Sequence, residues 1–217
     1  MRKDYKLLIF DWDGTLIDSQ HGIVSCMKSA MRDVGLPVLN DDEIQNIIGL
    51  GLYEAITTLY PNVTEDHYTK LVDRYRHHFL SMEQSLPFEG VPAALNQLYA
   101  QGYVMAVATG KGRVGLERAL QSIQFGHVFK ATRCADETQS KPHPQMLYEI
   151  LDELQVSAES ALMVGDTEYD LAMAQSAEVD CVAVSYGVHD IERLHQYSPV
   201  QTLNHFSELL PWLSTDY

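Results

Sequence analysis

The sequence predicts an α/β protein whose core is a doubly wound, Rossmann-like parallel sheet and which carries an inserted all-helical cap. Two observations lead to this fold class. After residue 87, short apolar runs alternate with amphipathic helical segments, and such alternation is typical of a parallel sheet with helices on both faces. Between residues 19 and 86, apolar positions recur at helical spacing and no segment has strand character, which predicts a separate helical block.

The individual elements follow from these patterns. The first strand is expected at residues 5–10, where an apolar run ends abruptly in Asp-Trp-Asp-Gly-Thr. Helices broken by glycine and proline are then expected at residues 19–35, 41–48, 52–60 and 64–82. Further strands are expected at residues 103–109, 128–132, 161–165 and 181–185. The core is therefore predicted to comprise residues 1–17 and 87–217, and the cap residues 18–86, with hinges near Asp18 and Pro87.

The composition argues against several functional classes. The 217 residues carry a formal net charge of −15, which disfavours nucleic acid or an anionic membrane surface as the main partner, because both favour clustered lysine and arginine. The apolar run at residues 7–10 is far too short for a signal peptide core or a membrane span. The cysteines lie far apart without Cys-x-x-Cys spacing, as expected in a reducing compartment. We expect a cytoplasmic protein; the sequence leaves open whether it is a monomer or a homodimer.

Polar residues follow the predicted strands at the edge of the sheet where open parallel sheets bind their ligands. They are Asp11 and Asp13, Thr109 and Gly110, Asp166 and Asp170, and Lys141 beside Pro142 in the remaining loop. Carboxylates are hard oxygen ligands for Mg²⁺, and a hydroxyl, a lysine and glycine amides can neutralise a phosphoryl group. The set predicts a magnesium-dependent site for phosphoryl chemistry.

Each of these residues alone has a plainer interpretation. Asp-x-Asp-Gly-Thr is compatible with a turn, Thr109 with a helix cap, and Lys141 with a solvated residue before a helix. Asp166 and Asp170 could cap a helix and interact favourably with its dipole. All four segments nevertheless occur in order, each after a predicted strand or at a helix start, and this coincidence favours function.

The motifs resemble those of the haloacid dehalogenase superfamily, and within it the phosphatases with a small helical cap after the first strand. The resemblance covers nearly the whole chain. The matching segments are Leu8-Ile-Phe-Asp-Trp-Asp-Gly-Thr-Leu-Ile-Asp-Ser, Val107-Ala-Thr-Gly-Lys, Ser140-Lys-Pro-His-Pro and Val164-Gly-Asp-Thr-Glu-Tyr-Asp.

The resemblance implies a role for each residue. Asp11 would be the nucleophile and Asp13 the general acid and base, whereas Thr109 and Lys141 would bind the phosphate and the intermediate. The implied Mg²⁺ ligands are the acidic residues Asp11, Asp13, Asp166 and, directly or through water, Asp170.

The expected geometry agrees with these roles. Asp11 and Asp13, two residues apart at a strand end, can point to the same side. Asp11 would attack phosphorus to give an aspartyl-phosphate, and Asp13 would protonate the leaving oxygen and then activate water. Gly14 allows a sharp turn after the second carboxylate, and backbone amides there can donate to phosphoryl oxygens.

Two positions depart from the family pattern, and neither removes a catalytic group. Gly110 stands where the second motif often has Ser or Asn, and Glu178 stands where Gly is common after the fourth motif. The cap segment at residues 47–52 most resembles phosphoglycolate phosphatases. This implies a small phosphorylated metabolite, either a carboxylic acid or a sugar, as the substrate.

Other functions fit parts of the sequence. Residues 110–115 match Gly-x-Gly-x-x-Gly, but they follow the second strand and not the first, which disfavours dinucleotide binding. A phosphoacceptor signalling module would share the acidic residues, Thr and Lys, but has no obvious use for a helical insertion. A mutase of the β-phosphoglucomutase type would share all four motifs, and only the cap could separate it. Dehalogenation is disfavoured, because Asp13 supplies an acid that breaking a carbon–halogen bond does not need.

Overall fold

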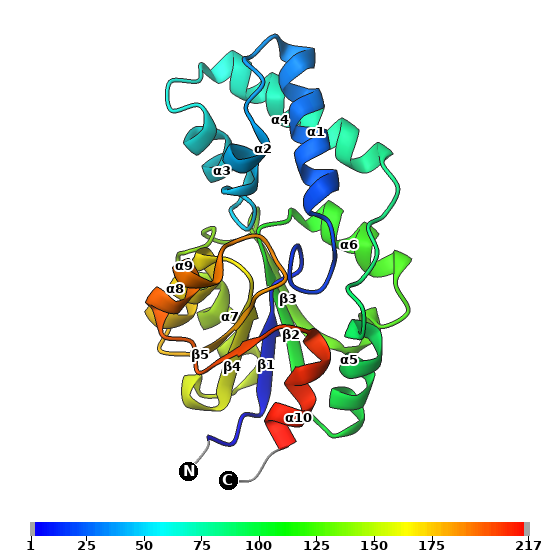
Figure 1. Ribbon diagram of the computed structural model, residues 1–217, viewed down its shortest axis with the longest axis vertical. Helices are drawn as coiled ribbons and strands as arrows, with labels where there is room; N and C mark the ends of the chain where they lie inside the picture. The colour runs from blue at the N-terminus through cyan, green and yellow to red at the C-terminus, as the bar shows by residue number, and fades with distance from the viewer. Residues whose placement is uncertain (1–2, 215–217) are drawn as a thin grey trace.

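The computed structural model describes residues 3–214, which form a six-stranded parallel sheet with a helical cap above its carboxyl edge (Figure 1). The strands are β1 (Leu7–Phe10), β2 (Val104–Thr109), β3 (Phe129–Cys134), β4 (Ala161–Gly165), β5 (Asp180–Val184) and β6 (Gln201–Leu203). Their order is β3-β2-β1-β4-β5-β6. The chain therefore reverses direction across the sheet between β1 and β4, which is where doubly wound sheets bind ligands. The predicted fold class is confirmed.

Helices cover both faces of the sheet, and successive residues of β1 enter opposite cores. Leu8 and Phe10 face one core, and Leu7 and Ile9 face the other. The helices that pack on the first face are α5 (Val91–Ala100), α6 (Arg113–Ser122) and α10 (Leu209–Ser214). Those on the second face are α7 (Gln145–Leu154), α8 (Glu168–Ser176) and α9 (Ile191–Leu194). A strand buried on both faces explains why β1 is an uninterrupted apolar run.

The cap has a hydrophobic core of its own, in which apolar residues of its four helices pack together. These helices are α1 (Gln20–Val34), α2 (Asp41–Gln45), α3 (Leu52–Leu59) and α4 (Glu65–Ser81). Gly35 ends α1 with φ of 72°, a left-handed conformation that glycine adopts without strain. Short 3₁₀ helices elsewhere span Gly126–Val128, Ala158–Ser160, His195–Tyr197 and Phe206–Glu208.

The two chain segments that join the cap to the sheet pair with each other. Ile17 forms an antiparallel bridge with Pro87, and the Asp18 amide donates to the Leu86 carbonyl at 2.9 Å. Within residues 3–214, no helix is both long enough and apolar enough to cross a membrane. All three cysteines are buried and free.

Two elements differ clearly from the sequence expectations. Strand β6 has no counterpart among the predicted strands, because it is three residues long and only Leu203 in it is buried. Helix α2 ends at Gln45 and not at residue 48, and the following residues form turns. Helix α7 begins at Gln145, so Lys141 and Pro142 lie in the loop before it, as expected.

Candidate active site

Three buried carboxylates and one buried lysine lie together at the carboxyl edge of the sheet. Asp11 follows β1, Asp166 follows β4, and Asp170 lies in the first turn of α8. One carboxylate oxygen from each lies within 4.8 Å of the other two. Lys141 is fully buried, and its Nζ lies 2.7 Å from Asp11 Oδ1 and 2.5 Å from Asp170 Oδ1. Residues from three separate motifs thus form one cluster.

Among the described residues of the chain, this cluster holds three carboxylates but only one ammonium group, that of Lys141. Burial raises the pKa of Asp11 well above its usual value, against the lowering effect of Lys141. Burial and the charge of Asp170 raise the pKa of Asp166 to about 7. Burial alone would lower the pKa of Lys141, but the carboxylates of Asp11 and Asp170 raise it above its usual value. The cluster therefore favours binding a further positive charge.

The donor set fits a hard divalent cation. Although Lys141 forms an ion pair with Asp11, neither Asp11 oxygen accepts a hydrogen bond of acceptable geometry within the described part of the chain. Buried carboxylate oxygens without hydrogen bonds are costly unless a cation compensates them. Oxygen atoms from Asp11, Asp166 and Asp170 are ligands of the kind that Mg²⁺ prefers.

Glycine makes room for this cluster. Gly14 has φ of +86°, and a Cβ built there would lie 2.2 Å from Asp166 Oδ2, so any side chain would collide with the carboxylate. The amide of Gly14 donates to the Ile17 carbonyl at 2.9 Å. The expected donation from this amide to a phosphoryl group is therefore not available in this conformation.

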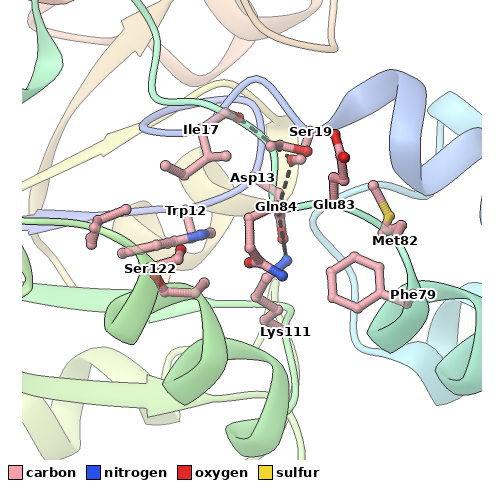
Figure 2. A pocket seen from close by; sticks show the side chains of 13 residues that line it. Trp12, Asp13, Ile17, Ser19, Phe79, Met82, Glu83, Gln84, Lys111 and Ser122 are labelled. Atoms are coloured by element: carbon pink, nitrogen blue, oxygen red, sulfur yellow. Dashed lines mark hydrogen bonds and ion pairs between the residues drawn. The ribbon is translucent and has the colours of Figure 1, made fainter.

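Asp13 lies outside the carboxylate cluster and is held by other partners. Its Oδ1 accepts a hydrogen bond from Ser19 Oγ at 2.6 Å, and Lys111 Nζ donates to Oδ1 at 2.8 Å and to Oδ2 at 2.7 Å. Figure 2 shows Asp13 between these two groups. All three residues line a small pocket of about 20 Å³. Asp13 is therefore not among the three clustered carboxylates, although it was expected to be a metal ligand with them, and its own carboxylate is bound by Ser19 and Lys111.

Lys111, which was not among the residues predicted for the site, connects this site to the cap. Its Nζ lies 4.5 Å from the centre of the Phe79 ring on α4, the geometry of a cation–π contact. One feature of the sequence could have identified it: Lys111 ends the motif Val107-Ala-Thr-Gly-Lys, directly after a strand that ends at the site. Charge patterning alone would have assigned such a lysine to solvent.

The second strand supplies Thr109 and Gly110. Thr109 is fully buried, and its Oγ1 accepts a hydrogen bond from the Lys111 amide at 3.2 Å. A Cβ on Gly110 would lie 2.5 Å from the carbonyl oxygens of both Gly49 and Leu50 in the cap. The absence of a side chain at Gly110 is thus explained by the close approach of the cap backbone.

The cap loop, which we define as residues 46–51, is docked on the core by hydrogen bonds at both ends. The Tyr169 hydroxyl donates to the Asn46 carbonyl at 2.8 Å, and Arg193 donates to the Asn46 side chain at 2.6 Å. The Gly51 amide donates to Ser140 Oγ at 2.6 Å. Between cap and core lies a chamber of about 590 Å³, whose floor includes Asp11. The cap loop therefore forms part of the wall of the site.

The match to a known family extends over most of this architecture. Residues 8–184 match the family described as haloacid dehalogenase-like hydrolase. The chain belongs to the haloacid dehalogenase-like hydrolases. The resemblance inferred from the motifs is confirmed.

Named relatives of this haloacid dehalogenase-like hydrolase cover nearly its whole length. "Probable phosphatase IndB" of Dickeya dadantii is 35% identical over 210 residues, which cover 94% of this chain and 91% of the relative. A phosphoglycolate phosphatase of Yersinia pseudotuberculosis is 32% identical over 209 residues, or 93% of this chain and 90% of the relative. A crystal structure from Haemophilus somnus, described as a "predicted phosphoglycolate phosphatase", has a TM-score of 0.88 at 25% identity and covers 98% of this chain and 99% of that one.

Proposed function

We propose that this hydrolase is a Mg²⁺-dependent phosphatase that hydrolyses a small phosphomonoester through an aspartyl-phosphate on Asp11. The observation that carries the proposal is the buried Asp11 carboxylate on the floor of the chamber, 2.7 Å from the buried ammonium of Lys141. A carboxylate held in this way is suited to act as a nucleophile, because the ammonium favours its ionised form. The names of the relatives as phosphatases support the same chemistry.

The metal is assigned to the clustered carboxylates. Asp11, Asp166 and Asp170 would hold Mg²⁺, which when bound supplies positive charge to the phosphoryl oxygens and to the nucleophile. Lys141 would supply further positive charge, since its ammonium pairs with both Asp11 and Asp170. Thr109, buried at the end of β2 and lining the chamber, would bind a phosphoryl oxygen through its hydroxyl.

The proposed reaction has two steps. An oxygen of Asp11 forms a bond to phosphorus while the bond from phosphorus to the leaving oxygen breaks, and Asp13 gives its proton to that oxygen. Asp13 then takes a proton from water as the water oxygen attacks the phosphoryl group, which releases inorganic phosphate and restores the Asp11 carboxylate. In the present conformation the Asp13 carboxylate is bound to Lys111 and Ser19, so it must leave at least one of these partners to reach the leaving oxygen.

We also propose that the chain divides into a catalytic core and a cap, and that the protein functions in the cytoplasm. Residues 1–17 and 87–217 would form the catalytic core and residues 18–86 the cap, and the paired segments at Ile17 and Pro87 would act as the hinge. The three buried free cysteines suit the reducing conditions of the cytoplasm.

Phosphate release from a panel of phosphorylated metabolites, measured with and without Mg²⁺, tests this proposal. We expect multiple turnovers with Mg²⁺, loss of activity after exhaustive chelation and its return when Mg²⁺ is added. Full activity after chelation would contradict the assigned metal. A single stoichiometric phosphorylation without further release would indicate a phosphoacceptor module, and phosphoryl transfer within a sugar phosphate would indicate a mutase.

A further inference from the structure

The chamber is large for a two-carbon acid. Its volume of about 590 Å³ lies within the range of roughly 300–1,000 Å³ that is typical of pockets for drug-sized ligands. It extends from the catalytic floor at Asp11 to the space between helices α3, α4 and α6. A phosphoryl group bound at the floor therefore leaves most of the chamber to the alcohol that carries it.

Aromatic rings of the cap form one wall of this space. Tyr75 and Phe79, one turn apart on α4, stack with their ring centres 5.8 Å apart at an angle of 24°. Tyr68 of the same helix meets Tyr53 of α3 edge to face at 5.6 Å. All four rings line the chamber, and flat faces of this kind favour contact with another planar ring.

The rim of the chamber is also apolar. Three residues from separate helices expose large side chains there: Tyr53 is 61% exposed, Leu80 41% and Val114 65%. Single exposed apolar residues need no explanation, but a group of them around the entrance of a pocket is typical of a binding site. These residues would contact the part of a ligand that extends toward solvent.

The charges of the chamber do not form a site for a second anionic group. The basic residues among its described lining are Lys111 and Arg76. Lys111 donates to both oxygens of Asp13, and Arg76 is an exposed side chain. A substrate carboxylate would need a buried cation to compensate its loss of water. The Lys111 side chain is largely buried but is already paired with Asp13, so neither residue offers a buried cation without a carboxylate partner.

We infer that the substrate is a phosphomonoester whose alcohol carries a planar aromatic or heteroaromatic ring, and that Tyr75 and Tyr53 contact that ring. The inference rests on the proposed phosphatase function. The Tyr75 hydroxyl has no hydrogen-bond partner within residues 3–214 and lines the chamber, and burial keeps its pKa above the usual value. It is therefore available to donate to a polar substituent of the ligand.

A pair of matched substrates tests the ring contact. Ethyl phosphate and 2-phenylethyl phosphate both release a primary alcohol, so they need similar help from the acid, but only the second has a ring. We expect kcat/KM for 2-phenylethyl phosphate to exceed that for ethyl phosphate and for phosphoglycolate by about 10- to 100-fold. Equal values, or a preference for phosphoglycolate, would overturn the inference while leaving the phosphatase function intact.

Binding provides a measurement that does not depend on turnover. Calorimetry with the non-hydrolysable 2-phenylethylphosphonate and ethylphosphonate, in the presence of Mg²⁺, should give a Kd at least about tenfold lower for the phenyl compound. Equal Kd values would overturn the ring contact. If neither phosphate ester is hydrolysed but the phenyl compound binds more tightly, the proposed function fails and the ring site stands.

Single substitutions identify the contact. Tyr53→Ala should lower kcat/KM for 2-phenylethyl phosphate by about 3- to 10-fold and change that for ethyl phosphate by less than about twofold. Tyr99→Ala is the matched control, since Tyr99 is 42% exposed on α5 and does not line the chamber. An equal loss with both substrates in Tyr53→Ala, or a loss only in the control, would contradict the assignment.

Discussion

Mg²⁺ should stabilise the folded protein more at pH 8 than at pH 5, because protons and metal compete for the same buried carboxylates. Burial, followed by the charge of Asp170, raises the pKa of Asp166 from 3.8 to about 7 in the metal-free protein. Between about pH 4 and pH 7 the folded state therefore binds one more proton than the unfolded state. By linkage, the stability of the metal-free protein falls as the pH rises through this window. The elevated pKa of Asp11 acts in the same direction.

The size of this effect follows from the pKa of Asp166. At about 1.4 kcal/mol per pH unit, the rise from 3.8 to about 7 corresponds to a loss of about 4 kcal/mol by pH 7. A bound divalent cation compensates the ionised carboxylates and so recovers much of that loss. At pH 5 the metal must first displace protons, and less stabilisation is available. For a chain of this length, 1 kcal/mol corresponds to about 2–4 °C in the midpoint of thermal unfolding.

Thermal unfolding with and without Mg²⁺ at both pH values is the assay, with ionic strength held constant by a monovalent salt. The rise in midpoint caused by Mg²⁺ should be several degrees larger at pH 8. Asp166→Asn should reduce this difference, since it removes the group with the displaced pKa. An equal rise at both pH values, or a larger rise at pH 5, would refute the reasoning about the cluster.

Three further substitutions test individual features. Lys111→Met should lower kcat/KM for an alkyl phosphate by up to about 100-fold, because the Asp13 carboxylate loses the ammonium that positions it. Lys130→Met, which removes a cation–π contact away from the site, should have no effect in the same steady-state assay. Gly110→Ala should weaken docking of the cap loop by about 1–3 kcal/mol and lower kcat/KM accordingly, with little change in the CD spectrum. Unchanged kinetics would contradict the close approach of the cap backbone to Gly110. Glu178→Gly should raise the free energy of unfolding by about 1 kcal/mol in urea titrations without changing activity, because Glu178 is held at φ of 57°.

The sheet was predictable from sequence because burial on both faces makes its strands uninterrupted apolar runs. Strand β6 was not, since its residues are mainly polar at the edge of the sheet and pairing with β5 defines it. Helix α2 ends early because the chain turns at Asn46, which the core binds through Tyr169 and Arg193. Such long-range contacts leave no local pattern in the sequence.

The candidate site was predictable to a similar extent. The motif residues Asp11, Lys141, Asp166 and Asp170 do lie together, because each follows a strand, precedes a helix or lies in the first turn of a helix at one edge of the sheet. The role of Lys111 depends on the orientation of Asp13 and on the approach of α4, neither of which spacing along the chain determines. The two departures from the family pattern, Gly110 and Glu178, have separate physical bases: the first makes room for the cap, and the second is a non-glycine residue in a left-handed conformation.

The most direct test of the proposed function is detection of the phosphoryl group on Asp11. Asp13→Ala, mixed rapidly with 4-nitrophenyl phosphate and Mg²⁺, should give a burst of nitrophenolate and accumulate the intermediate, because this leaving group needs little protonation whereas the second step needs Asp13 to activate water. Intact mass and peptide mapping should locate a hydroxylamine-sensitive phosphoryl adduct at Asp11, and Asp11→Asn should form none. Turnover in Asp11→Asn, or an adduct at any other residue, would contradict the proposed mechanism.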